Sequence, residues 1–158
     1  MCLIVDANTA GEFLAEPGPV TDWLLGRLGS PRLVLAGRLK EELGRLERVR
    51  RFLVTLDRAG RLRTVDPNQL SDEERRLCSE GLFESNDPHV LSLAIVSGAR
   101  TLATLDNALT RDFKNPRIIN QPRGSVYRDP KKHGALLGHT PQSCGIRAVK
   151  TRHLRRPK

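Results

Sequence analysis

Cysteines, aromatic residues and long apolar runs are all scarce in this sequence, and each shortage excludes something. Aromatic residues make up 4% of the 158 residues, so any core must be built from Leu, Val, Ile and Ala. No apolar run approaches the ~20 residues that a membrane-spanning helix needs. The first run, Cys2–Val5, follows no basic segment and ends at an aspartate. We therefore expect neither a secretion signal nor membrane association.

The three cysteines, Cys2, Cys78 and Cys144, are odd in number and show no paired spacing. Disulfide frameworks use even sets in oxidising compartments, so this pattern favours reduced thiols and a cytoplasmic protein. His133, His139 and Cys144 are spaced H-x5-H-x4-C, which raises the alternative of a zinc site. Three ligands without a CxxC pair favour surface histidines and a free thiol instead.

The net charge of +9 comes from the end of the chain. Residues 1–119 hold 17 Lys and Arg against 17 Asp and Glu, whereas residues 120–158 hold 10 against the single acid Asp129. A neutral body with a basic extension favours an anionic polymer as partner, RNA more than a membrane. The alternative is a solvated extension with no partner.

The hydrophobic pattern predicts one α/β domain over residues 1–120, followed by a basic tail, 121–158, that is flexible or loosely docked. Short aliphatic runs alternate with helical periodicity, which predicts a parallel sheet covered by helices on both faces. We expect strands over 2–5, 32–35, 62–65, 101–105 and, at an edge, 117–120. We expect helices over 9–14, 20–28, 39–59, 71–81 and 87–98, with a short one near Leu109 and Phe113.

Several acids are placed to meet at one edge of such a sheet. Asp6 and Asp106 each follow a predicted strand, and ligands of parallel α/β sheets bind outside the carboxyl ends of the strands. Asp87 begins a helix, and Glu41 or Glu42 lies early in another. Crowded carboxylates repel one another unless a hard cation such as Mg²⁺ or Mn²⁺ relieves the repulsion.

Each acid also has a simpler interpretation. Asp87 precedes Pro88 and Asp106 precedes a short helix, so both could be helix caps. Glu41 and Glu42 could be solvated helix residues. Asp6 is harder to explain in this way, because burying a carboxylate directly after Cys2–Val5 costs free energy unless it is paired. The joint placement of the acids, not any one of them, favours a metal site.

Four segments, in this order, resemble the motifs of PIN-domain proteins: IVDANTA, GRLKEEL, NDPHVLSLAIVSGA and TLATLDNALTRDF. The resemblance spans roughly Met1 to Asn120. It implies a Rossmann-like three-layer α/β/α sandwich and a nuclease site that needs a divalent metal, Mg²⁺ or Mn²⁺, and usually acts on RNA. Many bacterial and archaeal members are VapC-type toxins held inactive by an antitoxin.

The resemblance also assigns roles to residues. It implies that Asp6, Glu42, Asp87 and Asp106 are catalytic metal ligands, with Glu41 as the alternative to Glu42. It implies that Asn8 and Thr104 orient the acids and that Asp112 is an outer, water-mediated ligand. Hydrolysis of RNA would then leave a 5′-phosphate and a 3′-hydroxyl.

The basic tail lies outside the resemblance. We expect Arg123, Arg128, Lys131 and Lys132 to contact RNA phosphates, and Tyr127 is a candidate for stacking on a base. The sequence thus predicts a cytoplasmic, metal-dependent ribonuclease, with a toxin paired to an antitoxin as one form of it. The alternative is a non-catalytic RNA-binding module whose tail does the binding. Whether the protein forms a homodimer is left open.

Overall fold

The computed structural model describes residues 2–26 and 31–138. Within these residues the strands are β1 (Cys2–Val5), β2 (Arg32–Val34), β3 (Leu62–Arg63), β4 (Thr101–Ala103) and β5 (Ser125–Tyr127). The helices are the 3-10 helix η1 (Ala7–Thr9), α1 (Ala10–Leu14), α2 (Pro19–Leu24), α3 (Gly37–Leu43), α4 (Glu47–Arg58), α5 (Pro67–Glu80), α6 (Pro88–Ser97), α7 (Asn107–Lys114) and α8 (Pro130–Gly138).

The strands form one parallel sheet in the order β3-β2-β1-β4-β5. The central strand β1 is buried along its whole length, as expected for an aliphatic strand covered on both faces. Val5 at the end of β1 lies opposite Ala103 at the end of β4, so the chain leaves both strands at the same edge. The predicted α/β class with a central parallel sheet is confirmed.

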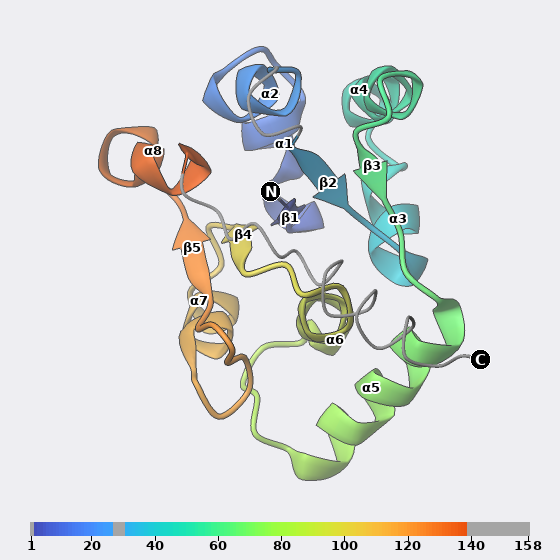
Figure 1. Cartoon of the computed structure of the whole chain (residues 1–158), viewed down its shortest axis with the longest axis vertical. Coiled ribbons are helices and arrows are strands. Elements are labelled where there is room, and N and C mark those ends of the chain that lie inside the picture. The colour runs from blue at the N-terminus through green and yellow to red at the C-terminus, as the bar shows by residue number, and fades with distance from the viewer. Residues whose placement is uncertain (1, 27–30, 139–158) are drawn as a thin grey trace, which may run out of the picture.

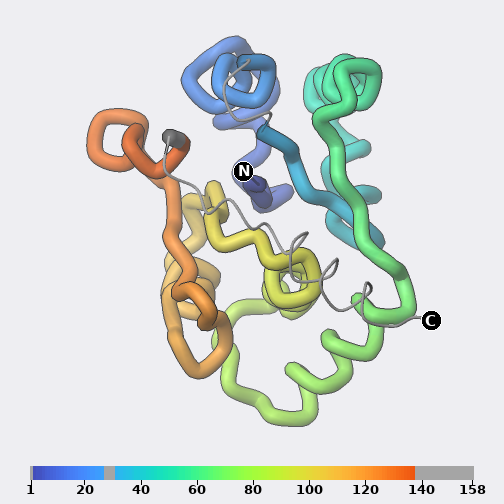
Figure 2. Tube along the Cα trace, viewed as in Figure 1, coloured from blue at the N-terminus to red at the C-terminus, as the bar shows by residue number. Residues whose placement is uncertain are grey.

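Helices cover both faces of the sheet and give three layers. Figure 1 shows α2 and α4 on one side of the strands and α6 and α7 on the other. Helix α6 is buried almost all round and packs closely against α5. Figure 2 traces α5 on the outer side of α6, away from the strands. The predicted central, buried helix that begins at Asp87 is therefore confirmed.

The single amphipathic helix predicted over residues 39–59 is wrong. The chain forms α3 and α4 instead, separated by a turn that contains Gly44 and an extended Leu46. Glycine is a weak helix former, so a break there costs little. The break also lets the two halves face different partners, because α3 contacts α6 whereas α4 contacts α1.

Two other helix boundaries differ from the prediction. Helix α5 begins at Pro67 rather than Ser71, because the Asp66 side chain accepts a hydrogen bond from the Asn68 backbone N–H and starts the helix earlier. Helix α2 ends at Leu24, and the predicted end at residue 28 lies outside the described residues.

The fifth strand predicted over residues 117–120 is also wrong. Ile118 and Ile119 are buried in a turn, and both backbone N–H groups donate to the Asn115 carbonyl. The buried Arg100 guanidinium holds the segment that follows, since it donates to the carbonyls of Asn120 and Pro122 at 3.3 and 3.0 Å. The apolar pair therefore fills the core without joining the sheet.

The fifth strand is β5, and with α8 it lies in the region predicted to be a tail. Val126 and Tyr127 are buried, and β5 pairs with β4 along its length. A close approach fixes its start: a Cβ on Gly124 would lie 2.2 Å from the Phe113 carbonyl oxygen. Residues 125–138 thus belong to the folded structure, and the tail expected to be flexible or loosely docked overlaps them.

The cysteines and helices bear on two further expectations. Cys78 is an exposed free thiol, which agrees with the expectation for this residue. In the described part of the chain, no helix combines the length and the apolar character needed to cross a bilayer.

Candidate functional site

Asp6 and Asp106 lie at the same edge of the sheet, as the sequence predicts. Asp6 follows β1 directly, and its backbone N–H donates to the Ala103 carbonyl at the end of β4 at 3.0 Å. Asp106 follows three residues after Ala103. The parallel pairing of β1 and β4 therefore delivers two acids from distant parts of the chain to one place.

Asp6 is a buried carboxylate held in a fixed orientation. Its side chain is 2% exposed, and one oxygen accepts a hydrogen bond from the Thr104 hydroxyl at 2.9 Å. The other oxygen accepts a longer bond, 3.4 Å, from the backbone N–H of Asn8. Burial raises the pKa of Asp6 above its usual value, and the charge of Asp106 adds to this, while the two hydrogen bonds oppose it.

Thr104 links the two strand-end acids. Its hydroxyl donates to Asp6 and accepts the Asp106 backbone N–H at 3.0 Å, and the residue is fully buried. This geometry agrees with the orienting role that the family resemblance implies for Thr104. Asn8, by contrast, contacts Asp6 through its backbone N–H, and its residue is exposed.

Asp87 stands at the start of α6 but does not cap it. Its side chain makes no capping hydrogen bond, although its position and the following Pro88 are typical of a capped helix. Burial raises the pKa of Asp87 most, followed by the charge of Asp6, with further contributions from Asp106 and Glu42. The carboxylate of Asp87 therefore lies in the electrostatic reach of all three other acids and has no other structural task.

Asp106 is a genuine helix cap. One of its oxygens accepts the Leu109 backbone N–H at 2.9 Å at the start of α7. Its charge nevertheless acts on both Asp6 and Asp87. Capping uses one lone pair of one oxygen, so it leaves the carboxylate able to bind a cation.

Of the two adjacent glutamates in α3, Glu42 is the one that faces the other acids. One of its oxygens lies 3.0 Å from Nε2 of His89, and the other accepts a bond from Arg38 at 3.1 Å. Glu42 is half-buried, whereas Glu41 is exposed. The geometry therefore favours Glu42 over Glu41.

His89 belongs to this cluster, and sequence reasoning missed it. It is 3% exposed and is the second residue of α6. Because the carboxylate of Glu42 accepts, Nε2 donates to it, and Nδ1 is buried with no hydrogen-bond partner among the described residues. The available signal was a histidine inside an otherwise apolar helix, two residues after Asp87.

Asp112 has a different environment from the outer metal ligand that was expected. It is 2% exposed, and both of its oxygens accept backbone N–H groups, from Glu84 at 2.9 Å and from Ser85 at 2.8 Å. These bonds tie α7 to the segment that leads into Asp87.

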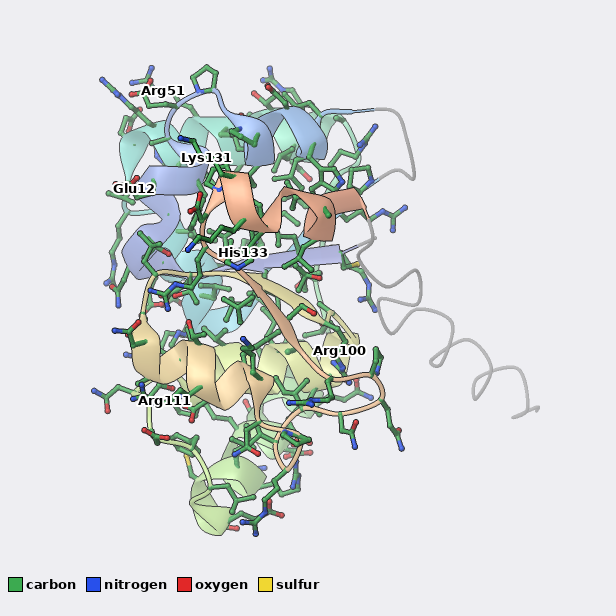
Figure 3. All side chains as sticks on the ribbon, turned by 90° about the vertical axis from the view of Figure 1, so that its left-hand side faces the viewer. Glu12, Arg51, Arg100, Arg111, Lys131 and His133 are labelled. Carbon is green, nitrogen blue, oxygen red and sulfur yellow. The ribbon has the colours of Figure 1, made fainter. Side chains whose placement is uncertain are left out.

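The basic residues expected at an RNA surface divide into two kinds. The Arg128 guanidinium turns inward and donates to Asn107, Thr110 and the Leu105 carbonyl, while Arg123 donates to the Lys114 carbonyl. Lys131 and Lys132 are exposed on the first turn of α8. Figure 3 labels Lys131 and His133 on this helix.

Tyr127 and His133 are both engaged inside the fold, which differs from the base stacking and zinc binding considered for them from the sequence. Tyr127 is fully buried, with its ring 5.7 Å from that of Phe13 in an edge-on arrangement, so it is not an exposed platform for a base. Nδ1 of His133 accepts the backbone N–H groups of Arg128 and Asp129, each at 3.1 Å. The other two residues of the suggested zinc set, His139 and Cys144, lie outside the described residues.

The acids are close in electrostatic terms but do not form a closed cage. Over residues 2–26 and 31–138, no three His, Cys, Asp or Glu side chains converge tightly enough to hold a metal ion between them. Mg²⁺ and Mn²⁺ suit oxygen donors, and Mg²⁺ typically keeps several waters while it binds one or two carboxylates. The pKa values of Asp6 and Asp87 are raised, first by burial and further by neighbouring acids, and the Asp87 side chain makes no cap. This donor set fits such a hydrated ion.

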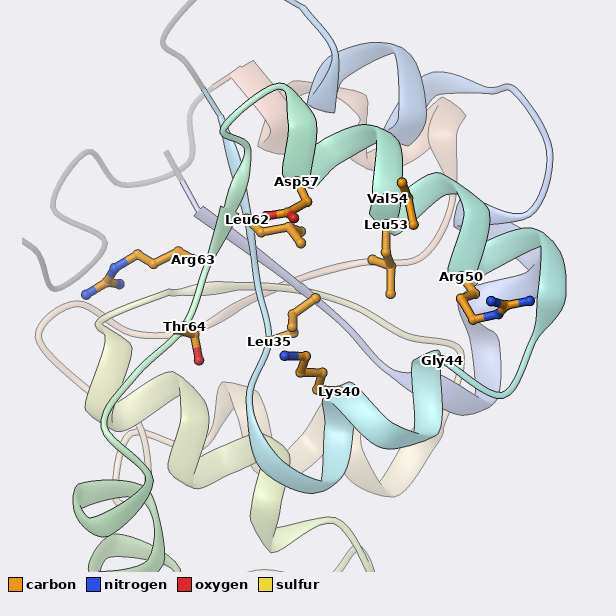
Figure 4. Close-up of a pocket in the computed structure, with 10 residues that line it drawn as sticks. All are labelled: Leu35, Lys40, Gly44, Arg50, Leu53, Val54, Asp57, Leu62, Arg63 and Thr64. Carbon is orange, nitrogen blue, oxygen red and sulfur yellow. The ribbon is translucent and has the colours of Figure 1, made fainter.

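A separate pocket of about 410 Å³ lies between α3, α4 and β3 (Figure 4). None of the four site acids lines it. Its walls are apolar with a basic rim: Leu35, Lys40, Gly44, Arg50, Leu53, Val54, Asp57, Leu62, Arg63 and Thr64. This pocket and the acidic cluster are thus different places on the molecule.

Comparisons with known proteins add little to what the geometry of the site shows. No protein-family model matches the chain, and no curated protein matches it significantly. Among solved structures, the chain is similar to one described as VapBC2 from Rickettsia felis bound to a DNA fragment from their promoter. The identity is 20%, the match covers 82% of this chain and 99% of the other, and the TM-score is 0.47.

Proposed function

We propose that this protein is a metal-dependent ribonuclease that hydrolyses RNA phosphodiester bonds at the edge of the sheet where Asp6, Glu42, Asp87 and Asp106 meet. The observation that carries the proposal is the state of Asp87. It is a partly buried carboxylate at a helix start that makes no cap, and the three other acids all raise its pKa. A chain gains nothing in stability from such crowding, so the arrangement points to binding a cation.

The surrounding side chains would each hold one acid in place. Thr104 would orient Asp6, the Leu109 backbone N–H of α7 would hold Asp106, and His89 would hold Glu42. One or two Mg²⁺ or Mn²⁺ ions bound by the four acids would supply an activated water and offset charge on the leaving oxygen. Asp112 would act indirectly, through the segment that precedes Asp87.

RNA as the substrate rests on the family resemblance and on charge. The chain carries a net charge of +9, and Lys131 and Lys132 are exposed on α8. Phosphate neutralisation by such residues contributes affinity that falls as salt rises.

The test is cleavage of assorted single-stranded RNAs by purified protein in Mn²⁺, Mg²⁺ or EDTA. We expect metal-dependent cleavage, and we expect Asp106→Asn to lower its rate by more than about 100-fold. Asp22→Asn, an exposed acid on α2, is the matched control and should cut like the wild type. The proposal fails if no RNA is cut in any metal, or if Asp106→Asn retains the full rate.

A truncation separates the nuclease from a tail-driven RNA-binding module. Because β5 and α8 are part of the fold, the cut must follow residue 138. Residues 139–158 hold six Lys and Arg and no acid. A nuclease should keep cutting without them, with weaker binding and a shallower salt dependence, whereas a tail-driven binder should lose all affinity.

An antitoxin partner stays a prediction from the family resemblance. Growth arrest on expression of this chain, abolished by Asp6→Asn, would support the role of a toxin. Co-purification of a small protein would support the partner.

A further inference from the structure

The pocket between α3, α4 and β3 is an apolar hollow beside one side of α4. Leu35, Leu53 and Leu62 line it, together with Val54, whose exposed fraction is 46%. Leu46, the N-cap residue of α4, is exposed to a similar extent, at 43%. Exposed apolar side chains gathered beside a hollow are typical of interaction sites. This side of α4 is therefore a candidate docking surface.

The residues of α4 that border the pocket follow a symmetrical order. Arg50, Leu53, Val54 and Asp57 all line the pocket, and Figure 4 shows them along the helix. Their spacing of i, i+3, i+4 and i+7 places them on one side of the helix, which we call the α4 face. The apolar pair stands at the centre of this face, with a cation three residues before it and an anion three residues after it.

The α4 face is complementary to itself. A second copy of the helix can pack against it in antiparallel fashion, about a two-fold axis that passes midway between Leu53 and Val54. Leu53 then meets Val54 of the second copy, Arg50 meets Asp57 of the second copy, and each contact occurs twice. A parallel pair would instead place Arg50 against Arg50 and Asp57 against Asp57, which like-charge repulsion disfavours.

The charged residues of the α4 face are available for such a contact. Asp57 is exposed and has no ion pair or side-chain hydrogen bond within the described part of the chain. Arg50 is paired with Glu47, but this pair is exposed, and exposed pairs contribute little stability. A guanidinium has five N–H donors, so Arg50 can bind a second carboxylate without releasing Glu47. Within one chain, Arg50 and Asp57 lie about 10 Å apart along the helix axis, too far for an ion pair.

Other sides of α4 are already covered within the chain. Val49 and Leu56 are fully buried in the core. Helix α1 packs against α4, and Arg48 pairs with Glu16 just beyond the end of α1. Strand β3, which borders the pocket, is an edge of the sheet. The α4 face is thus a side of the helix that a second molecule can reach.

We propose that two copies of this protein associate through the α4 face, with the two α4 helices antiparallel and each apolar pair beside the pocket of the other copy. A second copy is favoured over an unrelated partner because this face supplies its own complement in both charge and apolar character. None of the four site acids lines the pocket, so the inference does not depend on the proposed nuclease function.

Sedimentation equilibrium of the full-length protein at about 1–200 μM tests the association. EDTA excludes association through metal ions, and a reducing agent prevents disulfide pairing through the exposed Cys78. We expect the mean mass to rise with concentration from the 17.6 kDa of one chain toward twice that mass. A monomer at every concentration would overturn the inference.

Charge exchange tests the register of the two helices. Arg50→Asp places two aspartates against each other and Asp57→Arg places two arginines against each other, so each variant should raise the dissociation constant at least about tenfold. The double variant, Arg50→Asp with Asp57→Arg, restores opposite charges across the interface and should regain most of the wild-type association. Because these two residues do not reach each other within one chain, rescue reports a contact between copies. A double variant that associates no better than the single ones would overturn the antiparallel arrangement.

Val54→Asp tests the apolar centre of the interface, and Arg51→Asp is the matched control. Val54 is partly exposed, so its replacement should give a monomer whose melting temperature stays close to that of the wild type. Arg51 is also paired with Glu47 but does not line the pocket, so its charge reversal should change the dissociation constant by less than about twofold. An undiminished dimer in Val54→Asp, or equal losses in Arg50→Asp and Arg51→Asp, would place the association on another surface and overturn the inference.

Discussion

Replacing Asp112 by asparagine tests whether this residue is a metal ligand or a structural clamp. Both carboxylate oxygens accept backbone N–H groups in the protein interior. An asparagine keeps one acceptor and places an NH₂ group against the other N–H, so one charge-assisted bond is lost. Such a bond contributes about 1.5–3 kcal/mol. For a chain of this length, the corresponding fall in melting temperature is roughly 4–10 °C.

The assay is thermal and urea unfolding of wild-type and Asp112→Asn protein, with and without Mn²⁺. If Asp112 is a clamp, the variant loses stability in both conditions, and Mn²⁺ raises the melting temperature of both proteins by the same amount. The control is Asp129→Asn, since one oxygen of this acid accepts the Lys131 backbone N–H in an exposed setting. The reasoning is refuted if Asp112→Asn keeps its metal-free stability and loses the response to Mn²⁺, because that is the behaviour of a ligand.

Three further predictions follow from single contacts. Gly124→Ala should destabilise the protein by about 2–4 kcal/mol in urea unfolding, because its Cβ would lie 2.2 Å from the Phe113 carbonyl oxygen; an unchanged midpoint would contradict this. His89→Leu should lower the cleavage rate about 10–100-fold. His89→Gln should retain most of the wild-type rate, because glutamine can still donate to Glu42. Equal cleavage rates for the two variants would exclude an orienting role for His89. The pKa of Asp6 is raised above its usual value of 3.8 in the folded protein. Between these two pKa values the folded protein binds more protons than the unfolded chain. The free energy of unfolding of the metal-free protein should therefore fall as the pH rises through this window. Asp6→Asn should flatten this part of the pH profile in urea unfolding, and an unaltered profile would show that another group is responsible.

The sequence predicted best the features that depend on short, continuous runs of buried residues. Asp6 and Asp106 each follow a buried run, and parallel strands end at one edge, so their meeting required only that β1 and β4 be neighbours. The strand β5 was missed because three residues, Ser125–Tyr127, are too few to show a period. The apolar pair Ile118–Ile119 offered a stronger signal of the same kind, yet it is buried in a turn.

Side-chain direction was beyond the sequence for a different reason. Whether Glu41 or Glu42 faces the cluster depends on how α3 is rotated about its axis, and that rotation follows from packing of α3 against α6. The break at Gly44, which frees α3 to take that rotation, was itself not predicted. His89 was missed because a single polar residue in an apolar helix is ambiguous until its neighbour, Glu42, is known.

The four acids differ in how firmly they are held, and the difference has a physical logic. Asp6, Asp106 and Glu42 each have a hydrogen-bond donor that fixes the carboxylate, from Thr104, a backbone N–H and His89. A hydrogen bond to a carboxylate favours its charged form, so each donor opposes the effects of burial and of the neighbouring acids.

Asp87 has no such cap bond, and its pKa is raised by the other three acids. In the metal-free protein, it is therefore a carboxylate whose charge the fold does not neutralise. A bound divalent cation would neutralise it and stabilise the folded state in proportion to the free energy of binding. On this reasoning Asp87→Asn should make the metal-free protein more stable, by about 0.5–2 kcal/mol, and should reduce the further stabilisation by Mn²⁺. A metal-free variant no more stable than the wild type, with an undiminished response to Mn²⁺, would mean that the crowding of these acids serves some purpose other than binding a cation.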